Sequence, residues 1–171
     1  RLHGLGPILD AGTRLIVQNE DDRRFFLERG LVRPAQVVLI PGSGVDTGRF
    51  QPTPEPAGVP IVLYTGRMLA TKGLRELAQA ARLLRQRGVP FRLRFAGRLD
   101  PANPAALTES ELRSWEGEGL LEWLGPCDDI PELLAQCALV CLPSYREGLS
   151  LSLLEGAASG RPLVAADVPG C

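Results

Sequence analysis

The segment PIVLYTGRMLATKGLRELAQAARLLRQRG, residues 60–88, joins an apolar run to a longer amphipathic pattern. The first part, residues 60–66, is typical of a buried strand. The second part, residues 72–88, spaces its apolar side chains like one face of a helix, namely Leu74, Leu77, Ala78, Ala81 and Leu84. A strand that leads straight into a helix is the repeating unit of a parallel sheet. The segment therefore predicts an α/β fold.

The same alternation continues as far as residue 166. Further strands are expected at residues 91–97, 120–125, 138–143 and 161–166, and further helices at residues 107–115, 128–137 and 149–159. Residues 60–166 should therefore form one Rossmann-like parallel sheet of five strands, with helices on both faces. Such sheets bind ligands beyond the carboxyl ends of their strands, which is where functional residues are expected.

A shorter pattern of the same kind precedes residue 60. Residues 14–19 and 36–40 are expected to be strands, with a helix at residues 20–30 that begins after Asn19. The sequence VVLIPGSGVDTGRF, residues 37–50, is close to a dinucleotide-binding turn, but such a turn must open directly into a helix. Four prolines follow instead, Pro52, Pro54, Pro56 and Pro60, and they exclude that helix. We therefore expect residues 41–59 to be an extended linker, and a Rossmann-type dehydrogenase is the disfavoured alternative.

The composition narrows the classes of function. With 171 residues, the chain can hold one domain, or one domain and part of another. A net charge of −1 argues against nucleic acid as a partner. No apolar run is long enough to span a bilayer, and the opening RLHGLGPILDAG does not have the form of a signal peptide.

The four cysteines form no CxxC pair, and His3 is the single histidine, so no zinc site is expected. Cys137 and Cys141 are expected to be buried free thiols, which suits a reducing compartment.

Two carboxylates lie in the otherwise apolar sequence PSYREGLSLSLLEGAASG. Glu147 precedes the expected helix and Glu155 lies within it, and a buried carboxylate needs hydrogen-bond donors from the protein or from a ligand. Beside them, the backbone N–H groups of residues 148–151 would form an anion site at the helix start. Carboxylates next to such a site suit hydroxyl groups of a ribose or a sugar. The structural alternative is that Glu147 caps the helix and Glu155 pairs with an arginine.

Two cations follow the first strand of the main repeat. Arg67 and Lys72, in the sequence TGRMLATKG, should lie at the carboxyl edge of the sheet, where they could neutralise a diphosphate. The alternative is that both are ordinary solvated charges, although cations are unfavourable at a helix start.

Together these motifs resemble the C-terminal, donor-binding part of a glycosyltransferase of family 4 (group 1), which has the GT-B architecture. The resemblance covers nearly all of the chain, and its combination of motifs is highly specific although each motif alone is weak. IVQNEDD and IPGSGVDTGRFQP resemble the crossover into the second domain, and GRMLATKG resembles a phosphate clamp. EWLG resembles the strand before the loop that meets the base, and residues 143–171 resemble the family's paired-glutamate signature. The sequences PSYREG and ADVPGC are similar to those of enzymes of bacterial capsular, O-antigen and lipid-linked glycan synthesis.

The resemblance implies a role for each candidate residue. Arg67 and Lys72, in the clamp that includes Gly66, would bind the donor diphosphate and stabilise charge on the leaving nucleotide. Glu147 would orient the transferred sugar, and Glu155 would hold the ribose hydroxyls. Main chain near the β-phosphate would come from Gly148, Leu149, Ser150 and Leu151, and main chain near the base from Gly125 to Cys127. Glu147, Arg67 and Lys72 are thus the implied catalytic residues.

The resemblance also implies the reaction and its partners. A retaining transferase would move a hexose or N-acetylhexosamine from a nucleotide-diphosphate sugar, such as a UDP-sugar, to a glycan or a polyprenyl-diphosphate-linked acceptor, without a metal or other cofactor. A cytoplasmic location at the inner face of the membrane is implied, with membrane contact through the acceptor domain. A non-catalytic nucleotide-binding module on the same sheet is the second alternative.

Three features depart from the family pattern. Ser150 and Leu151 stand where relatives of this subtype often carry Pro-Lys, which removes a cation near the donor. Residues 1–40 read as a short remnant of the acceptor domain, with unusual spacing after GLG at residues 4–6. Residues 60–171 read as a donor-binding domain without its closing strand and helices. The chain alone is therefore expected to be inactive.

Overall fold

A computed structural model describes residues 9–10 and 12–171 of the chain; His3 and the GLG sequence at residues 4–6 lie outside this part. Its N-terminal unit contains β1 (Leu15–Val17), α1 (Glu20–Glu28), a 3₁₀ turn η1 (Pro34–Gln36) and β2 (Val37–Leu39). The two strands pair in parallel. α1 starts where the sequence predicts, because the Asn19 side chain accepts a hydrogen bond from the N–H of Asp22 and the first turn is acidic.

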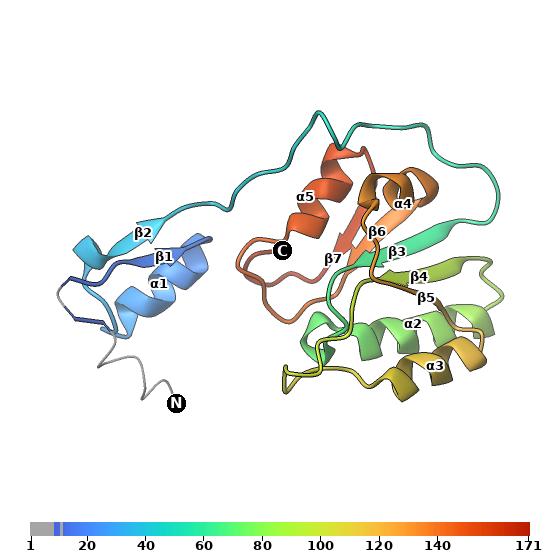
Figure 1. Ribbon diagram of the computed structural model, residues 1–171, viewed down its shortest axis with the longest axis horizontal. Coiled ribbons are helices and arrows are strands. Elements are labelled where there is room, and N and C mark those ends of the chain that lie inside the picture. Colours follow the sequence, from blue (N-terminus) through green and yellow to red (C-terminus); the bar gives the residue numbers. More distant parts are fainter. Residues whose placement is uncertain (1–8, 11) are drawn as a thin grey trace.

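Residues 41–59, all of them described, contain no helix or strand and run from the N-terminal unit past α5 and α4 (Figure 1). Arg161 holds this segment against the main sheet. Its guanidinium, in a residue only 5% exposed, donates to the Thr53 hydroxyl, to the Pro54 carbonyl at 3.3 Å and to the Ala135 carbonyl at 3.4 Å.

The main unit is the expected parallel sheet of five strands, which confirms the predicted fold class. In chain order its elements are β3 (Ile61–Thr65), η2 (Ala70–Lys72), α2 (Leu74–Gln86), β4 (Arg92–Ala96), α3 (Glu109–Gly117), β5 (Glu122–Gly125), α4 (Ile130–Gln136), β6 (Leu139–Leu142), α5 (Leu151–Ala158) and β7 (Leu163–Ala165). All of its strand pairs are parallel.

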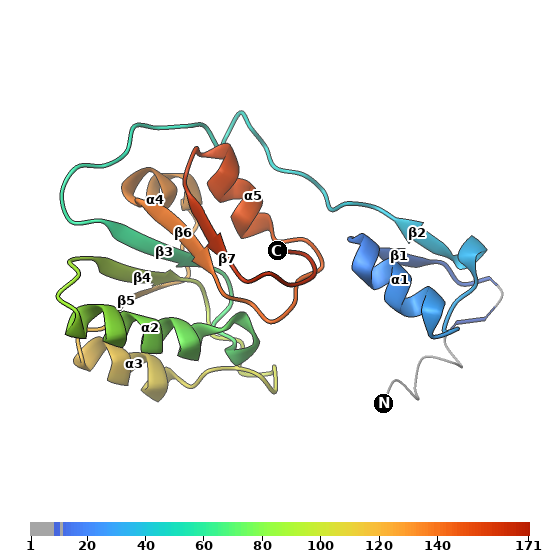
Figure 2. The same ribbon diagram turned by 180° about the vertical axis from the view of Figure 1, so that it is seen from behind.

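The strand order, β5-β4-β3-β6-β7, creates a switch point between β3 and β6. From β3 the chain winds outward through β4 to β5 and then crosses back to β6 and β7. As a result α2 and α3 cover one face of the sheet, and α4 and α5 cover the other (Figures 1 and 2). The core between these layers is apolar and is centred on β3, β4 and β6, whose buried side chains include Leu63, Phe95 and Val140. In such sheets the crevice beside the switch point is the favoured ligand site.

The four helices of the main unit, α2 to α5, each start two residues later than the sequence pattern suggests. α2 begins at Leu74 because residues 70–72 form a 3₁₀ turn and Gly73 then takes a left-handed conformation, with φ of 71°. α5 begins at Leu151, with Ser150 as its N-cap. Within the part of the chain that the structure describes, no helix is long and apolar enough to cross a membrane.

Candidate functional site

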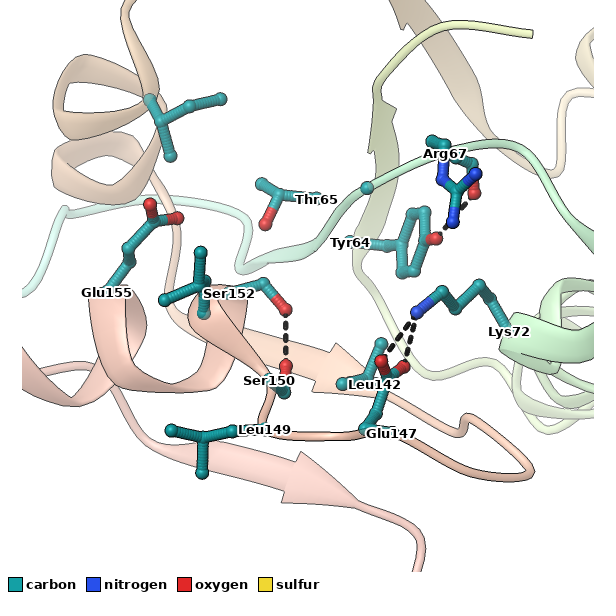
Figure 3. Close-up of a pocket in the computed structure, with 13 residues that line it drawn as sticks. Tyr64, Thr65, Arg67, Lys72, Leu142, Glu147, Leu149, Ser150, Ser152 and Glu155 are labelled. Atoms are coloured by element: carbon teal, nitrogen blue, oxygen red, sulfur yellow. Dashed lines mark hydrogen bonds and ion pairs between the residues drawn. The ribbon is translucent and has the colours of Figure 1, made fainter. Parts of the chain in front are cut away.

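A cavity of about 390 Å³ lies at the carboxyl ends of β3 and β6, beside the switch point (Figure 3). It brings together residues that follow β3 with residues that follow β6. Most of the candidate residues named from the sequence line it: Gly66, Arg67, Lys72, Glu147, Leu149, Ser150, Leu151 and Glu155. Arg67 and Lys72, expected at the carboxyl edge of the sheet, thus line one cleft together with residues 149–151 and the two glutamates.

Three candidate residues lie outside this cavity. Gly148 lines an adjoining cavity, also of about 390 Å³, that shares Arg67, Lys72 and Glu147 with the first. Gly125 and Cys127 line neither of these cavities, and the Cys127 thiol lies 3.5 Å from the Gly125 carbonyl oxygen. Beyond β5 it is Ile130, at the start of α4, that reaches the main cavity. Contact between the base and Gly125 or Cys127 thus stays a prediction.

Lys72 and Glu147 form an ion pair at the mouth shared by the two cavities. The Lys72 Nζ lies 2.6 Å from both carboxylate oxygens of Glu147. The side chains are 20% and 11% exposed, so the pair is largely shielded from water. Lys72 is the one lysine among 19 basic residues of the sequence, all others being arginine. A compact ammonium group can turn from one partner to another more readily than a forked guanidinium can.

Main-chain contacts hold the two sides of this pair together. The Thr71 carbonyl, next to Lys72, accepts from the Tyr145 N–H at 3.0 Å and from the Ser144 hydroxyl at 3.3 Å. Ser144 is fully buried. The η2 turn and the chain that follows β6 are thereby fixed side by side, and the ion pair is a consequence of that fixed spacing.

Arg67 occupies the rim of the cavity. Its guanidinium pairs with Asp100 at 2.8 Å, but the Arg67 side chain is 49% exposed, so this ion pair is weak and replaceable. Its carbonyl accepts a hydrogen bond of 2.7 Å from the hydroxyl of Tyr64, which is fully buried. Burial in the apolar core raises the pKa of Tyr64, so the hydroxyl remains a donor at neutral pH. Tyr64 fixes the backbone from which Arg67 projects.

Glu155 lies on α5, on the side of the cavity away from Arg67 and Lys72 (Figure 3). Its carboxylate has neither a hydrogen bond nor an ion pair within the described ranges, so the arginine pairing considered from the sequence is absent there. Burial raises the pKa of Glu155, and the charge of Arg49 partly offsets that rise. A half-buried carboxylate without a donor is costly unless a ligand supplies one.

The start of α5 differs from the simple anion site predicted from the sequence. Ser150, and not Glu147, caps the helix by accepting from the Leu153 N–H at 3.3 Å. The Ser150 N–H itself donates to the Gly170 carbonyl at 3.1 Å, so it is already engaged. Leu151, where relatives carry a cation, is 48% exposed and lines the cavity.

Several lining residues were not identified from the sequence. Tyr64, Thr65 and Leu142 lie on the strands themselves, and Ser152 lies on the first turn of α5. Tyr64 directly precedes the TGR turn, and a polar aromatic residue in an otherwise apolar strand was the available signal. Among the described residues no cluster of three or more potential metal ligands is present.

The sheet order, the cleft at its switch point and the paired charges are those of a Rossmann-like α/β protein with a ligand site beyond the carboxyl ends of its strands. The family model of the glycosyl transferases group 1 matches residues 59–171, which is most of the chain. The chain belongs to that family.

Relatives and solved structures agree with this assignment. The chain is 30% identical over 171 residues to the N,N'-diacetylbacillosaminyl-diphospho-undecaprenol alpha-1,3-N-acetylgalactosaminyltransferase of Campylobacter jejuni, covering 92% of this chain and 43% of the relative. It is 31% identical over 169 residues to the putative glycosyltransferase EpsD of Bacillus subtilis, covering 91% of this chain and 43% of the relative. The chain thus spans less than half the length of these relatives.

Two solved structures share the fold. Sucrose-phosphate synthase of Thermosynechococcus elongatus matches with a TM-score of 0.76 and 26% identity, over 96% of this chain and 43% of that one. Anabaena HepE in complex with UDP-glucose matches with a TM-score of 0.74 and 24% identity, over 92% of this chain and 46% of that one. These neighbours are GT-B glycosyltransferases, so the parallel sheet described above is part of a GT-B fold.

Proposed function

We propose that the protein is a retaining glycosyltransferase, and that this chain is the part that binds its nucleotide-sugar donor. The donor is a nucleotide-diphosphate hexose or N-acetylhexosamine, with UDP as the nucleotide. One observation carries the proposal: a single cavity holds two cations, Arg67 and Lys72, and also the carboxylate of Glu155, which has no partner among the described residues. Cations at one side suit a diphosphate, and a carboxylate at the other suits the ribose hydroxyls.

The residues divide the chemistry between them. When the bond between the sugar and the diphosphate breaks, negative charge grows on the departing nucleotide, and Arg67 and Lys72 stabilise that charge. Glu147, which lines both cavities, orients the transferred sugar through the hydroxyl groups of that sugar. This task needs no metal ion, and we propose that the enzyme uses no cofactor.

The relatives support the choice of donor and acceptor. The name of the Campylobacter relative describes transfer of N-acetylgalactosamine to an undecaprenol diphosphate-linked sugar, and the HepE structure holds UDP-glucose. For the present protein we propose a glycan or a polyprenyl-diphosphate-linked acceptor, used at the cytoplasmic face of the membrane. Peripheral contact with that membrane would come from the acceptor-binding domain, and nucleic acid is not a partner.

Calorimetric titration of the full-length protein with UDP tests the donor site. Lys72→Met removes a charged contact with the diphosphate, so UDP affinity should fall by about tenfold to a hundredfold. Arg75→Met is the matched control, because Arg75 lines neither cavity and forms an exposed ion pair with Glu111 of α3. Equal affinities in the three proteins would overturn the proposal.

A non-catalytic nucleotide-binding module is the second candidate, because the same cavity could bind UDP without chemistry. Detectable sugar transfer by the full-length protein eliminates it. A dehydrogenase is disfavoured, since no helix follows the glycines within the described residues 41–59, and absence of NAD binding closes that question. We propose that acceptor orientation comes from the acceptor-binding domain and lowers the activation barrier by roughly 7–11 kcal/mol. Residues 1–171 alone should therefore transfer no sugar.

A further inference from the structure

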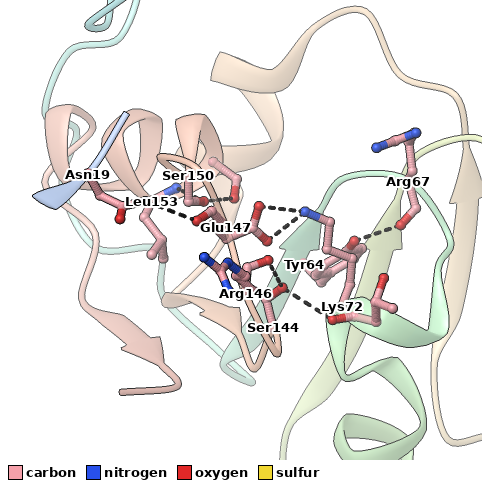
Figure 4. A network of polar contacts seen from close by, with 11 residues as sticks. Asn19, Tyr64, Arg67, Lys72, Ser144, Arg146, Glu147, Ser150 and Leu153 are labelled. Carbon is pink, nitrogen blue, oxygen red and sulfur yellow. Dashed lines mark hydrogen bonds and ion pairs between the residues drawn. The ribbon is translucent and has the colours of Figure 1, made fainter. Parts of the chain in front are cut away.

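Asn19 connects the N-terminal unit to the segment that carries Glu147 (Figure 4). Both the oxygen and the nitrogen of its carboxamide form hydrogen bonds. The oxygen accepts from the Asp22 N–H at 2.7 Å and so caps α1, while the nitrogen donates to the Gly148 carbonyl at 2.7 Å. The same nitrogen lies 3.4 Å from the Glu147 carbonyl. It also donates to the Asp22 carboxylate at 3.1 Å. The N-cap bond to the Asp22 N–H uses only the oxygen, so the bond to Gly148 is a separate contact.

Neighbouring residues reinforce this contact. Arg146 forms an ion pair with Asp22, and its guanidinium lies 5.3 Å from the ring centroid of Phe25. On the other side of Glu147, the Leu149 side chain lies against Gly42, at the start of the linker. Residues 146–149 are therefore in contact with the N-terminal unit or the linker on both sides of Glu147.

The opposite side of the same segment is attached to η2 of the main unit. Tyr145 and Ser144 donate to the Thr71 carbonyl, as described above, and the Glu147 side chain reaches Lys72. The Glu147 backbone thus faces Asn19 while its carboxylate faces the cavity. The placement of this carboxylate depends on both attachments.

We propose that Asn19 is a positioning residue for Glu147: its carboxamide N–H, by holding the carbonyls of residues 147 and 148, sets where the Glu147 carboxylate lies over the donor cavity. The effect on catalysis rests on the proposed function, because it requires that Glu147 contacts the transferred sugar. The attachment itself does not depend on that function. Through it, the position of the N-terminal unit is coupled to the geometry of the sugar site.

Two substitutions separate the attachment from the helix cap. Asn19→Ser and Asn19→Asp both keep an oxygen that can cap α1, but neither keeps an N–H donor for the carbonyls. Asp21→Asn is the control, because the one ion pair of Asp21 among the described residues is with Arg24, in the same helix. The attachment is read by hydrogen exchange of the Glu147 and Ser150 amides, which donate to the Pro169 and Gly170 carbonyls at 3.0 and 3.1 Å.

In the full-length protein, both Asn19 variants should exchange these amides about threefold to tenfold faster than the wild type and the Asp21→Asn control. Amides of β3 should exchange as before. Unchanged exchange at Glu147 and Ser150 in both Asn19 variants would overturn the proposal.

Steady-state kinetics then distinguish positioning from a merely structural role. We expect kcat with UDP-N-acetylhexosamine or UDP-hexose donors to fall about threefold to tenfold, while UDP affinity stays within about twofold, because both charges of the Lys72–Glu147 pair are retained and UDP lacks the sugar that Glu147 contacts. Faster exchange with an unchanged kcat would show an attachment without a positioning role. If the wild-type protein binds no UDP at all, the proposed function fails, and the exchange experiment still decides whether Asn19 attaches this segment.

Discussion

Lys72 Nζ lies 2.6 Å from both carboxylate oxygens of Glu147, although the two residues are 75 positions apart in the sequence. The proposed function gives them different ligands, the diphosphate for Lys72 and the sugar for Glu147. On that proposal, we expect donor binding to replace this ion pair with contacts to the donor. The Glu147 carboxylate then competes with the donor diphosphate for Lys72.

Glu147→Gln should therefore separate binding from catalysis. Removal of the carboxylate charge releases Lys72 and ends the repulsion between that charge and the phosphates, so UDP affinity should rise about threefold to tenfold. Sugar transfer should fall more than about tenfold, because the charged acceptor of sugar hydroxyl groups is lost. Calorimetry with UDP and a transfer assay measure the two effects. Glu111→Gln, at the exposed pair with Arg75, should change neither, and a weaker UDP affinity of Glu147→Gln would contradict the competition.

Glu155→Gln tests the ribose contact. Loss of charge-assisted hydrogen bonds should lower UDP affinity by about one to two orders of magnitude. Stability should not fall, because burial raises the pKa of the Glu155 carboxyl in the folded state. Such a group favours folding when it is protonated and loses that contribution as pH rises through its folded-state pKa. At neutral pH the neutral Gln should therefore match or exceed the wild-type melting temperature, and a large loss would assign Glu155 to the scaffold.

The same residue predicts a pH effect on binding. Acidification protonates Glu155 through its raised pKa and weakens its bonds to the ribose hydroxyls. The ratio of wild-type to Glu155→Gln affinities for UDP should therefore shrink between neutral and mildly acidic pH. Because the phosphates of UDP titrate equally in both experiments, their contribution cancels in this ratio. A ratio that does not change with pH would contradict the assigned contact.

Leu151→Lys should restore a cation to the donor site. The exposed side chain at this position lines the cavity, so UDP affinity should rise about threefold to tenfold and the gain should shrink as salt increases. A cation at the start of α5 opposes the helix dipole, so stability should fall by roughly 0.3–1 kcal/mol. Leu151→Gln provides the uncharged control. No gain at low salt would mean that this position does not face the phosphates.

Gly73→Ala should damage the site through the backbone. Gly73 has φ of 71°, and an added Cβ would overlap the Pro143 carbonyl, on the chain that leaves β6. Gly88 provides a matched control, since its φ is 72° but no atom lies within 4 Å of an added Cβ. We expect Gly88→Ala to cost about 1 kcal/mol for conformation alone, and Gly73→Ala at least about 2 kcal/mol more. Chemical denaturation measures both, and equal losses would show that the close approach of Pro143 has no energetic effect.

The sequence predicts the sheet well because the alternation of strands and helices depends on local patterns of apolar residues. The carboxyl-edge position of Arg67 and Lys72 follows from that alternation alone. The order of the strands does not follow from that alternation. Nothing in the local pattern places β6 beside β3, so the Lys72–Glu147 ion pair could not be anticipated. The contact between Asn19 and Gly148 joins residues 129 positions apart, and the same limit applies to it. Ser150 was identified as a departure from the family pattern, but its capping bond depends on where α5 begins.

The position of β6 beside β3 also has a kinetic consequence. The parallel pairing of Val62 with Leu139 and of Leu63 with Val140 closes a long loop, whose entropy must be lost before the strands gain their contacts. The cavity lies across that junction and should be completed late in folding, after the local β3–α2–β4 unit has formed. Substitutions that weaken the junction should then accelerate unfolding much more than they slow refolding.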